Sequence, residues 1–156
     1  MLNEVDFPLT NSQISEFILD KGYTTYFRLQ SALAELTDSG LLKIELTHNR
    51  TLYNLTEEGA ATINYFRNKI SPEIRQEIDN FINEKKYDLK EEVSVKSDYY
   101  LNTNHEYEVK CQILENGSHL IDMTLTVPTQ TEAEAIVNNW NRKNQEIYAL
   151  LLSQLL

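Results

Sequence analysis

The hydrophobic period of the chain changes from helical to alternating at Gly40. Before this glycine, apolar residues recur at spacings of three and four, which is the period of one buried helix face. These residues are Tyr26, Leu29, Leu33 and Leu36. After it, the apolar residues of segment 42–46 alternate with polar ones, as in a half-buried strand. Glycine at this junction suits a left-handed helix end. The pattern predicts a helix from about residue 24 or 25 to 39, followed directly by a strand.

A shorter helix is predicted just before this one. Thr10 and Gln13 fit a capping box, in which each side chain bonds a backbone N–H that the helix start leaves free. Ile14 and Phe17 then fall on one face, and the segment around Gly22 breaks the pattern. Two short helices joined by a tight, glycine-containing turn are the skeleton of a helix-turn-helix.

A hairpin and a third helix follow. Residues 47–50 are a polar turn, and 52–55 are expected to form the strand that returns beside 42–46. Thr56 is placed to cap the next helix, whose acidic first turn suits the positive end of the helix dipole. Residues 1–70 are therefore predicted to form a winged helix-turn-helix, which would serve as a DNA-binding domain.

Residues 71–156 are predicted to form a second domain, in the order helix, three antiparallel strands and long helix. The boundary is drawn where one helical pattern ends and a proline stands at the first position of the next. The whole chain is therefore expected to be α+β. The predicted elements are a helix over about 72–86, a weak strand at Val93 and Val95, strands over 106–113 and 119–127, and a helix from a capping box at Thr131 and Glu134 to about Leu155.

The connection between the last two strands allows two registers. A two-residue turn would pair Glu115 with Ser118 and would mix apolar and polar residues on each face. A three-residue loop pairs Leu114 with Ser118 and keeps one face apolar. Because the hydrophobic pattern fixes strand register, we expect the three-residue loop, with Gly117 left-handed at a bulge.

Several segments resemble those of bacterial winged-helix transcriptional regulators, including the PadR-like group. The run 29–42 is similar to their recognition-helix region, and segment 55–59 (Leu-Thr-Glu-Glu-Gly) resembles the Leu-Thr-x-x-Gly that closes their wing. More narrowly, segments 7–14 and 26–30 and the trailing three-stranded domain look like an uncharacterised bacterial winged-helix family, catalogued as a domain of unknown function. The narrower resemblance spans the whole chain. It implies a winged-helix fold.

The predicted final helix carries more apolar surface than one sheet can cover, since 148–152 is almost continuously apolar. A helix that is apolar on more than one side must be buried on more than one side, so we expect a homodimer through this helix. Winged-helix domains also begin with a helix beneath the other two, and here only residues 2–5 stand in that place. Either the natural N-terminus is longer than this sequence, or another element fills the gap. Our candidate for that element is the final helix, from the same or a partner subunit, which would lie beside Phe17 and Leu33.

The exposed flank of the predicted recognition helix carries side chains suited to bases and phosphates. Arginine binds guanine bidentately, glutamine pairs with adenine, and serine or threonine contacts either base or phosphate. The N-terminal end of this helix enters the major groove in helix-turn-helix proteins, and the hairpin tip would serve as the wing. Glu35 on the same flank would repel phosphate. The expected DNA contacts are Thr24, Thr25, Arg28, Gln30 and Ser31 on the helix, and Lys43, His48, Asn49 and Arg50 on the wing.

The net charge of −10 opposes a nucleic-acid role, because DNA affinity rests largely on lysine and arginine neutralising phosphates. The charge is uneven, however. Residues 1–70 carry six basic and nine acidic side chains, whereas 71–156 carry eight and fifteen. A homodimeric transcriptional regulator that binds double-stranded DNA is the leading hypothesis. The alternative is a winged-helix protein-interaction module that engages a basic partner and does not bind DNA.

Composition and motifs exclude several other classes. The chain has no run of about 18 apolar residues and no secretory signal at its start, so we expect a cytoplasmic protein without membrane contact. The three histidines lack metal-ligand spacing with Cys111, and catalytic and phosphate-loop motifs are absent. We therefore expect a non-catalytic protein without cofactor or metal.

A small-molecule effector stays open as a partner, and ligand binding without regulation is a third reading. The candidates for lining its pocket are Tyr99, Tyr100 and Tyr107.

Overall fold

A computed structural model describes residues 1–47, 50–115 and 118–156. The chain forms two compact units, Met1–Val93 (unit 1) and Ser94–Leu156 (unit 2). Unit 1 combines several helices, and unit 2 one helix, with a three-stranded antiparallel sheet, so the predicted α+β class is confirmed. The units divide at residue 93 and not at 70, because helix α4 (Pro72–Ser94) packs with the elements that precede it.

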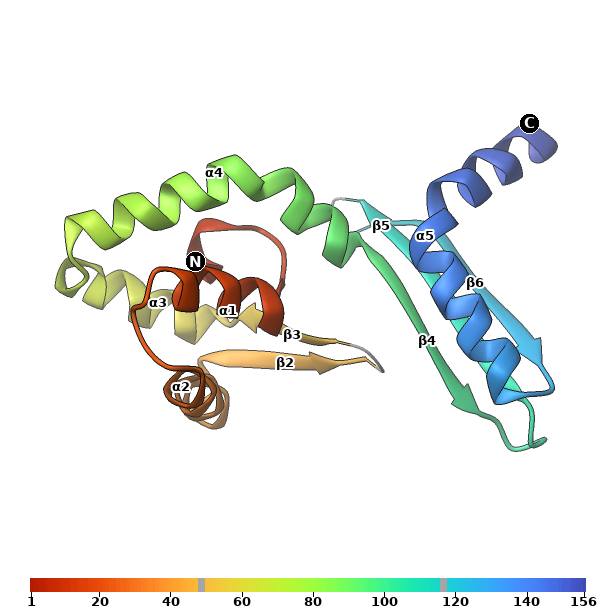
Figure 1. Ribbon diagram of the computed structural model, residues 1–156, viewed down its shortest axis with the longest axis horizontal. Coiled ribbons are helices and arrows are strands. Elements are labelled where there is room, and N and C mark those ends of the chain that lie inside the picture. Colours follow the sequence, from red (N-terminus) through yellow and green to blue (C-terminus); the bar gives the residue numbers. More distant parts are fainter. Residues whose placement is uncertain (48–49, 116–117) are drawn as a thin grey trace. The chain divides into compact units, whose positions relative to one another are not determined.

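Unit 1 places two helices before a hairpin and two helices after it (Figure 1). Its short sheet joins the hairpin to a two-residue strand that lies just before the first α-helix. In chain order its elements are η1 (Leu2–Glu4), β1 (Leu9–Thr10), α1 (Asn11–Asp20), α2 (Tyr26–Asp38), β2 (Leu42–Leu46), β3 (Thr51–Leu55), α3 (Glu57–Phe66), η2 (Arg67–Lys69) and α4.

The helix boundaries in this unit follow local chemistry. The predicted capping box is confirmed at the start of α1, where Thr10 Oγ1 accepts from the Gln13 amide (3.1 Å) and Gln13 Oε1 accepts from the Thr10 amide (2.9 Å). Gly22 and Gly40 follow α1 and α2 with φ of 67° and 72°. Side chains with a Cβ rarely adopt this left-handed conformation, so glycine at both positions lets the chain leave the helices without strain.

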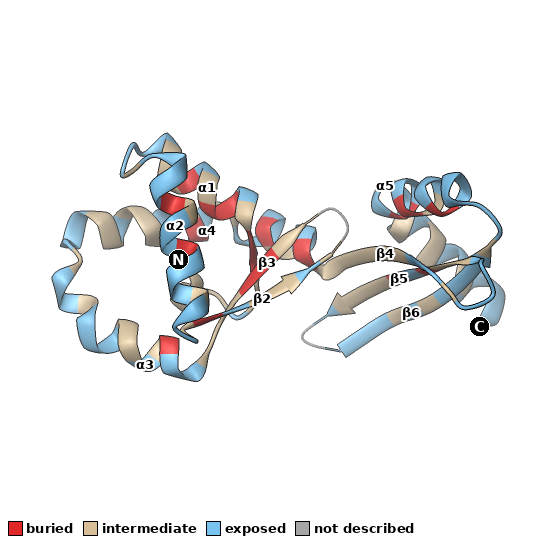
Figure 2. Ribbon diagram, turned by 90° about the horizontal axis from the view of Figure 1, so that it is seen from below, coloured by how far each residue is buried: buried red, intermediate tan, exposed pale blue. Residues whose placement is uncertain are grey.

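The sheet has the order β1-β3-β2. The predicted pairing of 42–46 with 52–55 is confirmed, since Leu42 lies opposite Leu55 and Ile44 opposite Tyr53. Helices α1 and α2 and the sheet share one apolar core, whose buried members are red in Figure 2. These members are Leu9, Ile14, Leu29, Leu33, Leu42 and Tyr53.

Helix α4 covers the face of α1 that we expected the final helix of the chain to cover. Phe17 is 2% exposed, and its ring centroid lies 4.9 Å from that of Phe81 on α4. The hydroxyl of Tyr23 also donates to Glu77 on α4, and this bond raises the pKa of Tyr23 to about 12. The expectation that the final helix fills the gap beside Phe17 is therefore wrong, because the apolar period of α4 supplies the missing surface within the same unit.

The sequence prediction also ended α4 too early. Val93, expected to begin a strand, is a buried residue of the last turns of the helix, and the strand begins only at Val95. Leu89 and Val93 are both buried and lie four residues apart, so the helical period continues through this segment. The Gln13 side chain fixes this end of α4, because Nε2 donates to the Leu89 carbonyl at 3.2 Å.

A tight junction joins the end of α2 to the start of α3. The Thr56 hydroxyl donates to the Gly40 and Leu41 carbonyls (2.8 and 3.0 Å) and accepts from the Gly59 amide (3.0 Å). Gly59 is buried, and a Cβ there would stand 2.1 Å from the Leu41 carbonyl oxygen. Glycine is therefore required at the last position of the Leu-Thr-x-x-Gly segment because the backbone of the neighbouring turn occupies the space.

Unit 2 is a meander of three strands with one helix on it. Its elements are β4 (Val95–Leu101), β5 (Tyr107–Glu115), β6 (Ser118–Val127) and α5 (Gln130–Leu155), in the sheet order β4-β5-β6. The helix packs mainly on β4 and β5 and less on β6. Val109, Cys111 and Trp140 are at most 1% exposed and form the centre of its core.

The register of β5 and β6 matches neither predicted alternative throughout. Glu115 lies opposite Ser118, as in the two-residue turn, and a shift between Ile113 and Leu114 then brings Ile113 opposite Ile121. The predicted pairing of Leu114 with Ser118 is therefore wrong, although one face remains apolar as expected. At this shift β6 has one residue more than β5. This extra residue brings the apolar side chains of the two strands back opposite each other, which the short turn alone would not do. The predicted left-handed Gly117 lies outside the described residues.

The last helix begins two residues earlier than predicted. Thr129 caps it, because its hydroxyl accepts from the Glu132 amide and the Glu132 carboxylate accepts from the Thr129 amide. The predicted box at Thr131 and Glu134 is wrong because both residues already lie inside the helix. The far end of α5 is exposed and apolar, with Leu150, Leu152 and Leu155 at 60%, 40% and 78% exposure.

Candidate nucleic-acid interface

Helix α2 buries one face and leaves a broad polar flank in solvent. Leu29 and Leu33 are 8% and 5% exposed and hold the helix against the core. Tyr26 and Leu36, expected to be buried with them, are 52% and 39% exposed. The predicted burial is therefore confirmed for Leu29 and Leu33 and wrong for Tyr26 and Leu36. The core of unit 1 contacts only the central turns of α2, so both ends of the helix stay at the surface.

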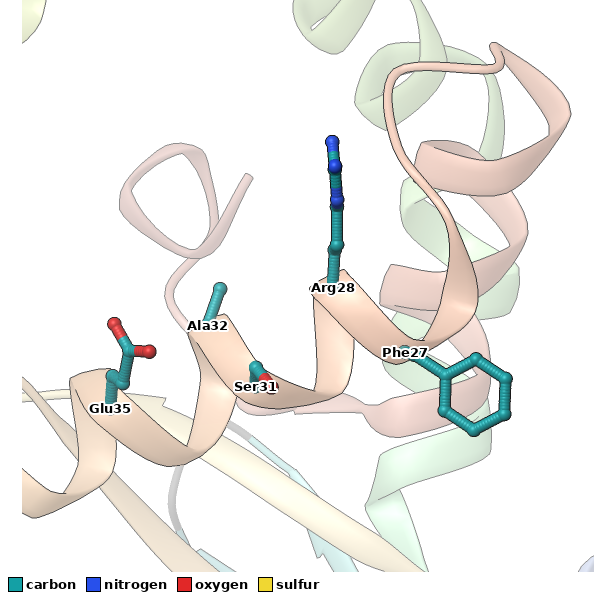
Figure 3. A pocket seen from close by; sticks show the side chains of 5 residues that line it. All are labelled: Phe27, Arg28, Ser31, Ala32 and Glu35. Carbon is teal, nitrogen blue, oxygen red and sulfur yellow. The ribbon is translucent and has the colours of Figure 1, made fainter.

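The outer flank of α2 forms an open depression of about 410 Å³. Arg28, Ala32 and Glu35 extend from one side of the helix, and Phe27 points away from them (Figure 3). Within the part of the chain that the structure describes, the Arg28 guanidinium has no ion pair. The residues that line the depression are Phe27, Arg28, Ser31, Ala32 and Glu35.

The first turn of α2 exposes a threonine beside this flank. Thr25 is the N-cap residue and is exposed, and its hydroxyl accepts no capping hydrogen bond. Thr24 is half-buried. The Thr25 hydroxyl and the amides of the first turn lie at the positive end of the helix dipole, which favours an anion such as phosphate.

Gln30, one of the predicted DNA contacts, faces the neighbouring helix. Its Oε1 accepts from Asn11 Nδ2 at 2.8 Å, and its Nε2 donates to Asn11 Oδ1 at 3.2 Å. Asn11 Nδ2 also donates to the Tyr53 hydroxyl at 3.3 Å. This network ties α1 to α2, so the Gln30 amide is already bonded inside unit 1.

The predicted wing residues fall into three groups. Lys43 is exposed on β2, whereas His48 and Asn49 lie outside the described residues. Arg50 is half-buried, and its Nη1 donates to the Glu92 carbonyl on α4 at 2.5 Å. The structure therefore leaves Arg28 and Lys43 as the exposed basic side chains among the predicted contacts that it describes.

Arg50 also lines a second, polar depression of about 430 Å³ beside the start of α1. The Glu92 carboxylate in its wall accepts from Gln13 Nε2 at 2.8 Å. A carboxylate in this position opposes phosphate binding, because like charges repel. The residues that line it are Thr10, Asn11, Ser12, Thr47, Arg50, Thr51 and Glu92.

Phe27 is the residue at this surface that sequence reasoning missed. Its side chain is 83% exposed, although phenylalanine is usually buried. The available signal was its spacing: Phe27 stands two residues before Leu29, and residues two apart in a helix lie on nearly opposite sides. A helix that buries Leu29 and Leu33 turns Phe27 outward.

The described residues offer few groups suited to metal binding or to nucleophilic chemistry. They contain no group of three or more metal-ligating side chains. Cys111 is buried in the core of unit 2, where desolvation raises its pKa to about 11 and keeps the thiol protonated. Tyr99 and Tyr107 stand with ring centroids 6.0 Å apart, and the Tyr99 hydroxyl donates to Glu134 on α5. These two tyrosines brace the helix against the sheet.

Fold and surface together define a mixed α+β protein in which one helix leaves a polar flank exposed beside a hairpin. The chain belongs to a family described as a domain of unknown function (DUF4364), whose model matches residues 1–155. No curated protein and no solved structure matches the chain. Across the described residues, no helix has the length and apolar character needed to cross a membrane.

Proposed function

We propose that this protein is a cytoplasmic, non-catalytic transcriptional regulator whose unit 1 is a winged helix that binds duplex DNA. Helices α1 and α2, the β2–β3 hairpin and α3 follow one another in the order of that fold. One observation carries the proposal. Helix α2 is anchored through Leu29 and Leu33 and leaves Thr25, Arg28 and Ser31 on its open flank. A helix of this kind can enter a major groove, where arginine and hydroxyl side chains contact bases and phosphates.

The protein acts as a homodimer under this proposal. Two copies double the small number of phosphate contacts and set the spacing of two half-sites. Leu150, Leu152 and Leu155 at the exposed end of α5 support self-association, because apolar helix surface in water favours burial.

A titration of labelled duplex DNA at low and moderate salt tests the proposal. Arg28→Ala should weaken binding at least several-fold, since a bidentate arginine–guanine contact contributes about 1–3 kcal/mol. Arg142→Ala, an exposed arginine on α5, is the matched control and should bind like the parent. If the parent protein shows no salt-sensitive binding to any duplex, the DNA-binding proposal is wrong.

Phe27 favours a second candidate function, a protein-interaction module. A phenylalanine that is 83% exposed beside Arg28 and Ser31 resembles the aromatic anchor of a protein interface. The net charge of −10 would then attract a basic partner. Phe27→Ala would abolish partner binding under this reading and would have a smaller effect on phosphate-driven DNA binding.

A further inference from the structure

Strand β6 presents an unpaired edge. Within the described residues it pairs only with β5, and it forms the outer edge of the sheet over ten residues (Figure 2). Monomeric proteins usually protect such edges with lysine, proline or a short strand. The sequence of β6 contains neither lysine nor proline. Its one irregularity lies near its start, so the segment 121–127 is regular.

The charge on this strand does not protect the edge either. Asp122 is the one acidic residue of β6, and its carboxylate accepts from Gln112 Nε2 on β5 at 2.8 Å. Lys110 Nζ on β5 lies 3.8 Å from the same carboxylate. Gln112 and Lys110 both lie on β5, so they draw the Asp122 carboxylate toward the inside of the sheet. His119 Nδ1, on β6 itself, lies 3.7 Å from the same carboxylate. The other edge strand, β4, carries Lys96 and Asp98.

The apolar face of β6 is also incompletely covered. Leu125 is 40% exposed, and Ile121 and Met123 are half-buried, whereas Val109 and Cys111 on β5 are completely buried. The difference arises because α5 packs mainly on β4 and β5. A strip of apolar surface therefore runs along the same strand whose backbone edge is free.

We propose that β6 pairs with β6 of a second copy, antiparallel and with the two-fold axis at Thr124, to form one six-stranded sheet. Thr124 is the centre of the regular segment 121–127. This register places Ile121 opposite the partner's Val127 and Met123 opposite the partner's Leu125. All four lie on the apolar face, as the strict alternation of the strand requires.

The same register avoids opposed charges. Asp122 lies opposite the partner's Thr126, and Thr124 lies opposite the partner's Thr124, a cross-strand pair that hydrogen bonds favour. A shift by one residue would place apolar side chains opposite polar ones. Pairing centred on Asp122 would place two carboxylates opposite each other, which is destabilising. The second copy is therefore a self-complementary partner for this edge.

Charge substitution at the proposed axis tests the inference in the full chain. Sedimentation should show a dimer for the parent and monomers for Thr124→Glu and Thr124→Lys, because each variant opposes like charges across the axis. A one-to-one mixture of the two variants should recover the dimer. Thr131→Glu, at an exposed position in the first turn of α5, should dimerise like the parent. Circular dichroism checks that each variant is folded.

Cross-linking gives an independent readout. Thr124→Cys should form a covalent dimer on mild oxidation, whereas Thr126→Cys, which faces the partner's Asp122, should form much less. A monomeric parent, or a dimer that survives both charge variants and does not cross-link at position 124, would overturn the inference. The inference rests on the homodimer of the proposed function, places its interface at β6 and not at the end of α5, and depends on unit 2 alone. A chain that dimerises through β6 and binds no DNA contradicts the DNA-binding proposal and leaves this one standing.

Discussion

At the residue scale, Gly59 is a position of unit 1 where the neighbouring backbone leaves no room for a side chain. Gly59 lies where the backbone of α3 meets the Leu41 carbonyl oxygen, and the nearest other atom to a Cβ there is Leu55 Cδ1 at 2.8 Å. A side chain can rotate away, but a carbonyl that already accepts from the Thr56 amide (3.2 Å) cannot move without breaking that bond. The motif glycine is thus explained by space and not by an unusual backbone conformation.

Gly59→Ala should lower the free energy of unfolding by about 3 kcal/mol, because the added methyl group overpacks a backbone contact. Urea denaturation followed by circular dichroism measures the change. Asn64→Ala, an exposed position in the same helix, is the control and should alter stability by less than about 0.5 kcal/mol. Equal stability of Gly59→Ala and the parent would show that α3 can move away from Leu41.

Cys111 should make the stability of the protein sensitive to alkaline pH. Burial raises its pKa to about 11 in the folded chain, whereas an exposed thiol in the unfolded chain has a pKa of about 8.5. The stabilising effect is therefore complete below about pH 8.5 and is lost as the pH rises toward 11. Between pH 8 and 10, the free energy of unfolding should fall more steeply for the parent than for Cys111→Ala. Parallel curves would contradict the shifted pKa.

At the scale of elements, polar side chains fix how helices begin and how they pair. Thr129 and not Thr131 caps α5, and the mutual amide pair of Asn11 and Gln30 holds α1 beside α2. Both arrangements use residue types that the sequence offers at several positions. Which of them forms the bond depends on where the preceding strand or the neighbouring helix places the backbone.

Thr129→Ala should destabilise unit 2 by about 1 kcal/mol, the usual cost of removing an N-cap. Thr131→Ala is the matched control, because Thr131 is exposed inside the first turn and should change little. Thermal unfolding of the two variants compares them directly. A larger loss for Thr131→Ala would place the start of the helix two residues later.

Gln30→Ala should cost about 1–3 kcal/mol of stability, because it leaves the partly buried Asn11 amide without its partner on α2. Under conditions where the variant is folded, Gln30→Ala should have only a small effect on DNA affinity relative to the parent. Ser31→Ala should do the opposite, with little change in stability and weaker DNA binding. A pattern in which Gln30→Ala binds DNA poorly while remaining fully stable would return Gln30 to the interface.

At the scale of the whole molecule, the DNA-binding proposal must be reconciled with a net charge of −10. The structure reduces the number of basic side chains available to phosphate further, because the Arg50 guanidinium is hydrogen-bonded to α4. Specificity would then rest on side-chain contacts to bases more than on phosphate attraction. Under the same proposal, dimerisation would compensate for the few cations by doubling every contact with DNA.

The salt dependence of DNA binding should accordingly be shallow. Arg28 and Lys43 are the exposed basic side chains among the described predicted contacts. The logarithm of DNA affinity, plotted against the logarithm of salt concentration, should therefore have a slope of about −2 per protomer and about −4 per dimer. Fluorescence anisotropy over a series of salt concentrations measures the slope, and Lys43→Ala should reduce it. A much steeper slope would require basic residues outside this set.

The sequence by itself determined the local elements. Hydrophobic period, capping residues and glycines located the helices and the hairpin and indicated the α+β class. They could do so because these signals act over a few neighbouring residues. Tertiary structure alone decided which surfaces meet. Helix α4, not the final helix, covers Phe17, and Gln30 and Arg50 bond inside unit 1 while Phe27 stays outside. An amide or guanidinium bonds whichever group the fold brings near it, and no periodicity in the chain encodes that neighbour.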